Sequence, residues 1–535
     1  MIRRRIVPAL ILVALFALGW WVGRGTAGPD LYGNLDLFVE VLSRVEENYV
    51  DVVEPSKLMD GALKGMVRGL DPFSQYLDAH AWENLQATTH GTYEGVGLVV
   101  SIRDDYPTVI SPMEGSPAWA MGLHSGDIIV RIDSVPTNGM SVEDVADKLR
   151  GPAGTHVQLS VRREGEDQDV EYSIERREIV TKSVPYSFVD GSTGYVRLAN
   201  FSETSGAELR TALDKLRQGG ATRLVLDLRS NPGGLLDQAV DVAEEFVKPN
   251  TLLVYTHGRV KGQDSRFYSS NKRPTLDWPL VVLVDEGSAS ASEIVAGALQ
   301  DLDRALVVGE TTFGKGLVQS VFPLRNRSVA LKLTTARYYT PSGRSIDKPR
   351  TIAALADATE DEDDEEGDET SAPPSHTESD TLPKPVFHTA SGRVVYGGGG
   401  IHPDVVVATD SLPPLTRRVE TRGLSFRFAN RWVNQHPNTG SGAPVSPAVW
   451  DAFTKFLRDE KITYTPAELS DERPLLERAL RRELARRTGG DAAAVRVALE
   501  GDPVFERALE VLSRSRTPRE VFAAARTTDR MPATR

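Results

Sequence analysis

Short apolar runs alternate with helical segments over residues 194–339, and this alternation constrains the fold more than any other feature of the chain. Residues 224–226 and 280–284 are apolar throughout, which predicts strands buried on both faces. Residues 235–246 and 290–302 follow them with helical periodicity. Alternating strands and helices are typical of an α/β layer.

The 535 residues are enough for three or four domains, and the pattern changes along the chain. Short strand and turn signals fill residues 91–177, whereas residues 35–82 and the Arg-rich part beyond 412 are mainly helical. The predicted fold class is therefore a multidomain α/β protein. Its predicted parts are a signal peptide or anchor (1–27), a helical N-terminal domain (30–90), a β-rich domain (91–177), an α/β core (178–350), an acidic disordered insertion (351–385), the end of the core (386–410) and a helical C-terminal domain (411–535).

The acidity of the chain is local. The formal net charge is −13, but residues 357–369 hold ten carboxylates and no base. Without them, 62 basic residues face 65 acidic ones, so no global field attracts nucleic acid. Residues 351–385 are poor in aromatics and rich in acids, Ser, Thr and Pro, which predicts a disordered surface insertion. An acidic binding tail is the alternative.

The chain contains no cysteine. This excludes a thiol nucleophile, a disulfide framework and Cys-ligated zinc. No motif in the sequence predicts a metal site or a cofactor.

The N-terminus has the pattern of an export signal. Arg3, Arg4 and Arg5 precede an uncharged, mostly apolar run at residues 6–22. The run is just long enough to span a bilayer, and Gly25-Thr26-Ala27 offers a small-x-small cleavage site. A cleaved signal peptide and a retained membrane anchor both stay open. In either case the arginines predict an exported body, in the periplasm or anchored in the inner membrane of a bacterial envelope.

Glycines and apolar positions recur in a specific order after residue 92. Tyr93-Glu94-Gly95-Val96-Gly97-Leu98 is followed by Gly115-Ser116-Pro117-Ala118 and then by Gly126-Asp127. A Gly-rich hairpin would explain any one of these motifs. Their succession resembles the PDZ domain, in the arrangement common in bacterial proteases. The resemblance implies that the backbone N–H groups of Val96, Gly97 and Leu98 bind a peptide's terminal carboxylate while the peptide adds as a strand to the sheet edge.

Ser290 lies where a buried strand meets a helix. The free N–H groups and dipole of a helix N-terminus favour developing negative charge there. However, Ser290-Ala291-Ser292-Glu293 also matches the capping-box pattern, and taken alone this pattern favours a helix cap over a nucleophile.

Lys315 lies between Gly314 and Gly316 in an otherwise apolar neighbourhood, where a solvated turn is the simplest interpretation. Residues 309–315 also fit the G-x-x-x-x-G-K pattern of a phosphate-binding loop. Gly316 lacks the hydroxyl that would hold Mg²⁺, and residues 317–322 predict a strand where that loop requires a helix. Both departures argue against phosphate binding.

Together the two segments resemble the C-terminal processing peptidase, or tail-specific protease, family of serine proteases. The similarity covers residues 35–407 and implies a crotonase/ClpP-like core. It implies that Ser290 of S-A-S-A-S-E is the nucleophile, that Lys315 of T-F-G-K-G is the general base, and that Gln319 orients the lysine amine. It also implies a backbone oxyanion hole made by Ala291 with Gly233 or Gly234. Asp301 resembles an aspartate of some members, although packing at a helix C-terminus explains it more simply.

A lysine base demands a particular setting. Burial among apolar groups favours the neutral amine and lowers its pKa, so that it can take the Ser290 proton. An acyl-enzyme follows. Backbone donors then stabilise the oxyanion by about 2.7–4 kcal/mol each.

Two other functions remain as alternatives. A PDZ scaffold that binds without cutting is the first, and the intact Ser290, Lys315 and Gln319 argue against it. A crotonase-like acyl-CoA hydratase is the second, which the export signal and the PDZ motifs disfavour because coenzyme A is intracellular. The expected partners are polypeptides bound by their C-termini. An adaptor protein, a homo-oligomer and contact with the membrane through an uncleaved N-terminal segment stay open.

Overall fold

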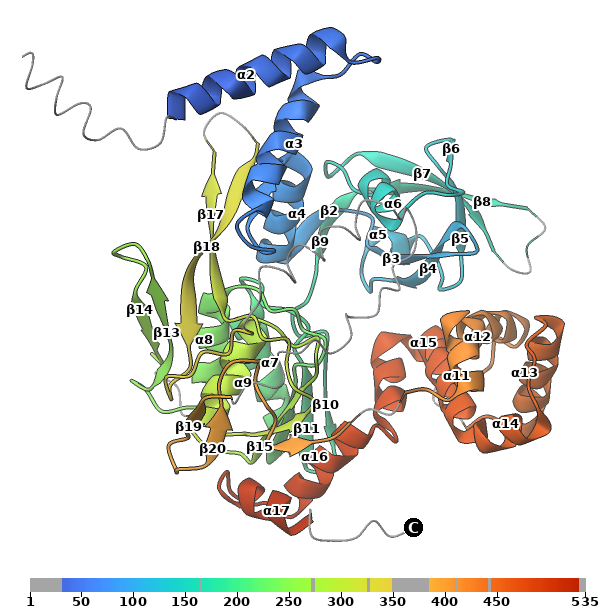
Figure 1. The fold of residues 1–535 in the computed structure, drawn as a ribbon. Helices are drawn as coiled ribbons and strands as arrows, with labels where there is room; N and C mark the ends of the chain where they lie inside the picture. The colour runs from blue at the N-terminus through green and yellow to red at the C-terminus, as the bar shows by residue number, and fades with distance from the viewer. Residues whose placement is uncertain are drawn as a thin grey trace, which may run out of the picture. The chain divides into compact units, whose positions relative to one another are not determined.

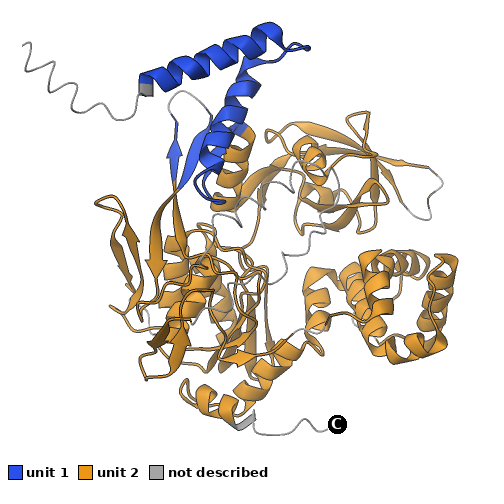
Figure 2. Ribbon diagram, in the orientation of Figure 1, with its two compact units in different colours: residues 1–79, 321–333 blue, residues 80–320, 334–535 orange. Residues whose placement is uncertain are grey.

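The computed structural model describes residues 31–163, 166, 168–270, 275–324, 328–348, 384–408, 411–440 and 444–528. The chain divides into two compact units, one of residues 1–79 with 321–333 and one of residues 80–320 with 334–535 (Figure 2). The predicted signal or anchor (1–27) and residues 351–383 of the predicted insertion lie outside the described residues. No helix of the described ranges is long and apolar enough to cross a membrane.

The first unit is mainly helical, as predicted for the N-terminal region. It contains α2 (Leu31–Asn48), α3 (Pro55–Arg68) and β1 (Gln75–Leu77). Pro55 begins α3, which ends at Arg68 and is followed by Gly69. The helix does not continue further, because Pro72 disfavours helical backbone at Asp71. Strand β1 pairs antiparallel with β18 (Ala330–Tyr339), with Gln75 opposite Lys332. Several apolar side chains of α2 are exposed, among them Leu37 and Phe38.

Within the second unit, residues 92–180 form the β-rich region that the sequence predicts. Its sheet has the strand order β3-β4-β5-β7-β8, and β2 pairs separately with β9. Ser141 caps α6 as expected, because its side chain accepts the Asp144 N–H at 3.1 Å. The elements are α4 (Ala79–His90), β2 (Thr92–Gly95), β3 (Leu98–Arg103), β4 (Tyr106–Pro112), α5 (Pro117–Ala120), β5 (Ile128–Ile132), β6 (Val135–Pro136), α6 (Val142–Leu149), β7 (His156–Arg162), β8 (Val170–Glu175) and β9 (Arg177–Val180).

The α/β core, whose strands β10, β11 and β15 are labelled in Figure 1, is built on a six-stranded sheet of order β10-β11-β12-β15-β16-β21. All neighbours pair in parallel except β10 with β11. The elements are β10 (Tyr186–Asp190), β11 (Thr193–Arg197), α7 (Ser205–Gln218), β12 (Arg223–Asp227), α8 (Leu236–Glu244), β15 (Leu280–Val284), α9 (Ala291–Asp301), β16 (Leu306–Gly309) and β21 (Val405–Val406).

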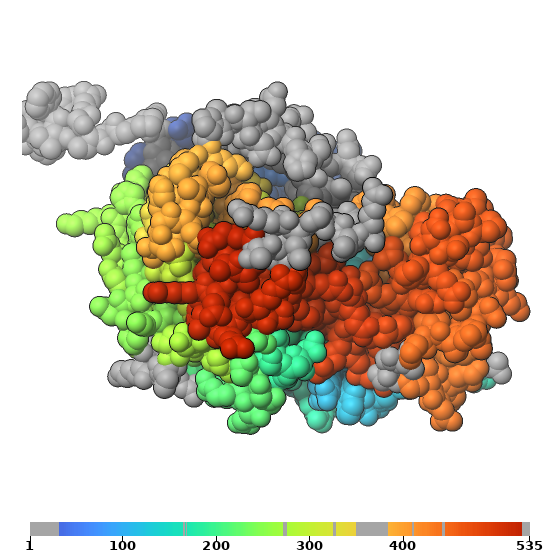
Figure 3. All heavy atoms as spheres, turned by 90° about the horizontal axis from the view of Figure 1, so that it is seen from below, coloured from blue at the N-terminus to red at the C-terminus, as the bar shows by residue number. Residues whose placement is uncertain are grey.

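Both faces of this sheet are buried, which explains why its central strands are apolar throughout. Leu226 and Val282 face the cluster formed by α7, α8 and α9. Val225 and Val281, one residue out of phase, face the opposite cluster, which contains α16 (Pro503–Ser513) and α17 (Glu520–Thr528). In the space-filling view the red atoms of these two C-terminal helices lie against the green atoms of the core (Figure 3).

A second sheet, whose residues 321–333 belong to the first unit, and a small helical bundle complete the fold. The sheet joins β13 (Leu252–Gly258), β14 (Ser265–Tyr268), β17 (Leu317–Pro323) and β18, and β19 (Val386–His388) pairs with β20 (Val394–Tyr396). The bundle has its own hydrophobic core. Its helices are α11 (Pro414–Thr421), α12 (Leu424–Gln435), α13 (Pro447–Asp459), α14 (Pro466–Asp471) and α15 (Arg473–Leu499). The predicted helical C-terminal segment therefore contributes to two separate cores.

Candidate active site

Three loops meet where neighbouring parallel strands of the core end. Strand β12 ends at Asp227, β15 at Val284 and β16 at Gly309, and β15 pairs with both of the others. Because parallel strands share one carboxyl edge, the loops that follow them lie side by side. These loops carry the predicted Gly233-Gly234, Ser290 and Lys315 motifs.

Ser290 does not have the backbone of an ordinary helix cap. Its φ of 54° and ψ of −111° lie outside the regions that L-residues favour. The cap residues Ser141, Ser446 and Thr465 all have extended backbones, with φ between −69° and −87°. A strained backbone at the start of a buried helix is typical of functional sites, where the surrounding structure holds it in place.

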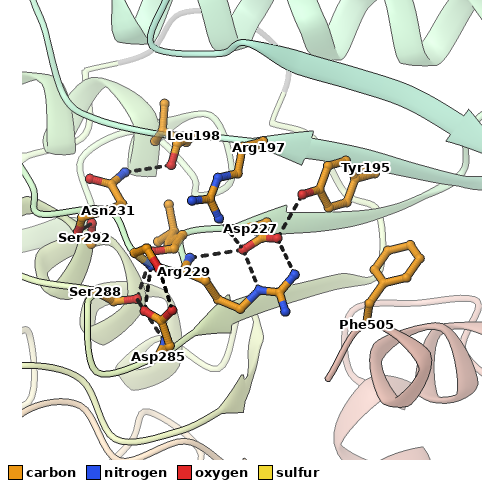
Figure 4. Close-up of polar contacts among 12 residues, drawn as sticks. Tyr195, Arg197, Leu198, Asp227, Arg229, Asn231, Asp285, Ser288, Ser292 and Phe505 are labelled. Carbon is orange, nitrogen blue, oxygen red and sulfur yellow. Dashed lines mark hydrogen bonds and ion pairs between the residues drawn. The ribbon is translucent and has the colours of Figure 1, made fainter. Parts of the chain in front are cut away.

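The two serines that flank Ser290 in S-A-S-A-S have structural roles. Ser288 is fully buried and donates to the Leu228 carbonyl oxygen at 2.8 Å. Ser292 is fully buried and donates to the Asn231 carbonyl oxygen at 2.9 Å, a pair drawn in Figure 4. Ser290 is only partly buried. Of the three serines, Ser290 is therefore the one that substrate can reach.

The Gly233-Gly234 loop lies directly against Ser290. A Cβ built on Gly233 would lie 2.8 Å from Ser290 Cβ and 2.9 Å from the Ala291 nitrogen, closer than any real side chain allows. Gly233 has φ of 96° and Gly234 has φ of 145°, conformations that favour glycine. The Gly233 N–H donates to Asn231 Oδ1 at 2.9 Å, whereas Gly234 N–H has no acceptor among the hydrogen bonds of the described residues.

Glu293 links the nucleophile loop to the lysine loop. Its carboxylate is completely buried and accepts the backbone N–H groups of Ser290 (2.9 Å), Gly314 (2.8 Å) and Lys315 (2.9 Å). The Thr312 hydroxyl donates to it as well, at 2.5 Å. Burial raises the pKa of the Glu293 carboxyl, and these donors partly oppose that shift. A single carboxylate thus fixes the backbones of Ser290 and Lys315 relative to each other.

Tyr338 of β18 makes a second link between the same two loops. Its hydroxyl contacts the Ser290 carbonyl oxygen at 3.1 Å and also the Lys315 carbonyl oxygen. Burial raises the pKa of Tyr338 well above its ordinary value, so the phenol keeps the proton that it donates. Lys315 and Gln319 are partly buried, and the Gln319 amide donates to Thr334 Oγ1 at 3.5 Å.

Asp227, the last residue of β12, anchors the start of the Gly233-Gly234 loop (Figure 4). Its buried carboxylate binds the guanidinium groups of Arg197 (3.1 Å) and Arg229 (2.7 Å) and accepts the Tyr195 hydroxyl at 2.9 Å. Burial alone would raise the pKa of Asp227, but the two arginines outweigh it and lower the pKa. Asp227 therefore stays ionised, which suits a residue that holds two cations.

The predicted carboxylate-binding loop at Val96, Gly97 and Leu98 connects β2 to β3. Gly97 has φ of 76°, and a Cβ on it would lie 2.3 Å from Ser116 Cβ. The carbonyl oxygens of Val96 and Gly97 accept hydrogen bonds from Ala118 N (3.0 Å) and Ser116 Oγ (3.1 Å). The Gly-Ser-Pro-Ala motif thus holds the loop through its carbonyl oxygens.

Sequence reasoning missed two residues of this site, Glu293 and Tyr338. In the sequence, Glu293 stands out only as the last residue of a capping box. No local motif separates Tyr338 from other strand residues. The strand predicted at residues 317–322, one of the two departures that argue against a phosphate-binding loop, is confirmed as β17. Asp301 ends α9 in a fully buried ion pair with Arg344, at 2.7 Å. Among the described residues, no group of three or more His, Asp or Glu side chains is placed to hold a metal ion.

Comparison with known proteins gives consistent matches along the chain. Residues 192–353 match peptidase family S41, residues 108–163 match the PDZ domain, and residues 28–81 match the activating protease CtpB N-terminal domain. A carboxy-terminal-processing protease of Bartonella bacilliformis is 41% identical over 321 residues, which cover 59% of this chain and 73% of that protein. A carboxyl-terminal-processing protease of Synechocystis is 41% identical over 294 residues, which cover 54% of this chain and 68% of that protein.

Among solved structures, the photosystem II D1 C-terminal processing protease is 31% identical and covers 58% of this chain and 89% of that one, with a TM-score of 0.34. The chain belongs to the carboxy-terminal-processing proteases of serine peptidase family S41. It is therefore a serine-type endopeptidase with a PDZ domain, and the hydratase and scaffold alternatives are set aside.

Proposed function

We propose that this protease cleaves polypeptides with a Ser290–Lys315 pair and selects them by their C-termini. The observation that carries the proposal is the bonding of Glu293, which joins the amides of Ser290 and Lys315 across two loops. A nucleophile and its base must keep a fixed separation, and a buried four-donor carboxylate between their backbones supplies that constraint.

In the first half of the reaction, Ser290 Oγ attacks the carbonyl carbon of the substrate while its proton passes to the neutral Lys315 amine. The C–N bond of the resulting tetrahedral intermediate then breaks. Lys315 gives the proton to the leaving amine, and the acyl group remains as an ester on Ser290. Gln319, four residues after Lys315, orients the amine through its own side chain.

The developing oxyanion binds the backbone N–H groups of Ala291 and Gly234. Ala291 is the first residue of α9, so its N–H is not used by the helix, and the helix dipole favours the negative charge. Gly234 is the better of the two glycines for this role because the Gly233 N–H already bonds Asn231. Water then attacks the ester, Lys315 takes a proton from the water, and the Ser290 oxygen regains it on leaving.

Substrate selection belongs to the PDZ domain. The N–H groups of Val96, Gly97 and Leu98 bind the terminal carboxylate of the substrate, and the chain upstream of it adds to the sheet edge. Ser116 and Ala118 support this role because they hold the carbonyl side of the loop. In the cell, the N-terminal segment carries the protease into the envelope, as residues 3–27 predict.

The test compares the purified wild-type chain with its Ser290→Ala and Lys315→Ala variants on an unfolded polypeptide that ends in small apolar residues. Wild type should cleave it, and both variants should be inactive. An uncleaved substrate at every pH from 6 to 10 would overturn the proposal.

Two further measurements separate the parts of the mechanism. The wild-type rate should rise with pH as the Lys315 amine loses its proton, and a rate that stays flat from pH 5 to 10 would exclude lysine as the base. Converting the substrate's C-terminal carboxylate to an amide should raise KM. An unchanged KM would mean that Val96, Gly97 and Leu98 do not bind that carboxylate.

A further inference from the structure

Helix α16 belongs to the core of the protease although it lies about 150 residues beyond the end of the S41 match at residue 353. Phe505, Ala508 and Leu512 are buried in the same cluster as Val225 and Val281 of the central strands. The Phe505 ring packs edge-on against Tyr195, with ring centroids 5.6 Å apart (Figure 4). The C-terminal segment therefore covers one face of the catalytic sheet.

The first turn of α16 also reaches the loop that carries Gly233 and Gly234. Asp502 caps the helix, because its Oδ1 accepts the N–H groups of Val504 (2.9 Å) and Phe505 (3.1 Å). Its other oxygen, Oδ2, lies 2.6 Å from Arg229 Nη1. Both side chains are only 17% exposed, so water screens the pair weakly.

Arg229 lies two residues after the end of β12 and is held between two carboxylates. Its backbone N–H and its Nε both donate to Asp227 Oδ1 at 3.0 Å, and its Nη2 donates to Asp227 Oδ2 at 2.7 Å. Asp502 binds the remaining terminal nitrogen. With both partners present, the guanidinium has one position, and the backbone of Arg229 is fixed with it.

The four residues that follow Arg229 transmit this position to Gly234. Ser230, at φ of 49°, donates its N–H to Asp285 at 2.6 Å. Asn231 binds the Leu198 carbonyl oxygen at 2.8 Å, and its own carbonyl oxygen accepts the Ala289 N–H at 3.0 Å. Asp502 is thus linked to the Ser290 loop by two hydrogen bonds, Arg229 Nη1 to Asp502 Oδ2 and Ala289 N to Asn231 O, and by the covalent chain of residues 229–231 between them.

We propose that Asp502 is a positioning residue for the oxyanion loop and acts through Arg229, so that the C-terminal helix α16 sets the geometry of catalysis. The inference rests on the proposed oxyanion role of Gly234. Loss of the Asp502 charge leaves Arg229 with Asp227 alone and loosens the loop by fractions of an ångström. Such a shift weakens binding of the transition state more than binding of the substrate.

The test is the Asp502→Asn variant of the full chain. Asparagine caps helices as well as aspartate does, so α16 stays capped while the ion pair is lost. With a peptide substrate, kcat should fall about tenfold while KM stays within about twofold, as expected for an interaction made in the transition state. A variant whose kcat stays within twofold of wild type would overturn the inference.

A peptide aldehyde provides a readout that a merely structural role would not change. Ser290 Oγ adds to the aldehyde carbon, the C=O π bond opens, and the serine proton passes to the new oxygen, which lies where the oxyanion forms. Asp502→Asn should weaken inhibition by the aldehyde about tenfold and leave binding of the matching peptide alcohol unchanged. Equal weakening of both inhibitors would mean a general loss of structure and would contradict the inference.

Glu510→Gln is the matched control, because Glu510 lies on the same helix and its ion pairs are local, with Arg507 (2.8 Å) on α16 and with Arg514 (3.1 Å), the residue that follows it. It should leave kcat unchanged, and a loss equal to that of Asp502→Asn would overturn the inference. If Asp502→Asn fails to fold, Asp502→Ser removes the same charge and keeps a capping side chain. The Ser290→Ala variant separates the two proposals: if it remains active, the proposed function fails, and if only Asp502→Asn has no effect, this inference fails alone.

Discussion

The N-termini of α6 and α9 share one capping-box pattern and have very different surroundings. Ser141 and Asp144 form a capping box at α6, and Ser290 and Glu293 have the same spacing at α9. Ser141 has an extended backbone and an exposed side chain, whereas Ser290 has φ of 54° and follows a fully buried strand. Among the hydrogen bonds of the described residues, the Asp144 carboxylate accepts only from Ser141, while Glu293 accepts from Gly314 and Lys315 in another loop.

The comparison shows that a capping-box sequence does not determine which other segments surround the helix N-terminus. At α6 the carboxylate is exposed to solvent, and the motif contributes only to the stability of one helix. At α9 the same motif lies at the carboxyl edge of a parallel sheet, where neighbouring loops contribute further donors. There the carboxylate becomes the junction of the candidate active site.

The largest difference between the two helices should appear when each serine is replaced by alanine. Ser290→Ala should reduce kcat by about 10⁴-fold or more, because it removes the attacking oxygen. Ser141→Ala should leave kcat unchanged and lower the free energy of unfolding by about 1 kcal/mol. Peptide cleavage and urea unfolding measure the two effects, and full activity of Ser290→Ala would show that α9 carries only a cap.

The second-largest difference between the two helices should appear when each capping-box carboxylate is replaced by its amide. Glu293→Gln should lower kcat about 100-fold, because an amide NH₂ cannot accept the N–H groups of Ser290 and Lys315 and leaves them buried without an acceptor. Asp144→Asn, the matched change at α6, should not affect kcat. Equal activity of the two variants in the same peptide assay would contradict the positioning role of Glu293.

The glycine that packs on Ser290 offers a third contrast. Gly233→Ala places a Cβ 2.8 Å from Ser290 Cβ, so it should lower kcat about tenfold or more in addition to its backbone strain. Gly154→Ala is the control, because Gly154 has φ of 84° but open space around its Cβ position. Both variants should lose roughly 1–2 kcal/mol of stability from the positive φ. A Gly233→Ala variant that keeps wild-type kcat would mean that the loop does not approach the nucleophile.

The smallest contrast is in how stability depends on pH. Hydrogen bonds from Ser141 lower the pKa of Asp144, so its contribution is present above the ordinary value of about 3.9 and is lost as pH falls through the folded-state pKa. Burial raises the pKa of Glu293, so its contribution is present below about 4.3 and is lost as pH rises through the folded-state pKa.

Urea unfolding from pH 3 to 9 should therefore show opposite slopes. Relative to Asp144→Asn, wild type should gain stability as pH rises, and relative to Glu293→Gln it should lose stability. Slopes of the same sign would mean that burial does not dominate the ionisation of Glu293.

The sequence by itself determined much of this protein. Apolar periodicity predicted the core strands β12 and β15 and the helices after them, because residues buried on both faces of a parallel sheet leave a continuous apolar run. The order of the glycine motifs predicted the PDZ region, and the Ser290 and Lys315 motifs indicated the family, which the comparisons confirm. The roles of the individual site residues, and the domain boundaries, stay predictions.

Only the tertiary structure decided which groups face one another. Local patterns describe a residue's neighbours along the chain, whereas Glu293 with Lys315, Tyr338 with Ser290, and Asp502 with Arg229 are contacts between distant segments. The last pair spans 273 positions, and no periodicity or motif links its two ends. The parallel sheet brings these groups together for two reasons. The loops that follow its parallel strands lie at one edge of the sheet. Both of its faces are buried, so helices from distant parts of the chain pack against them.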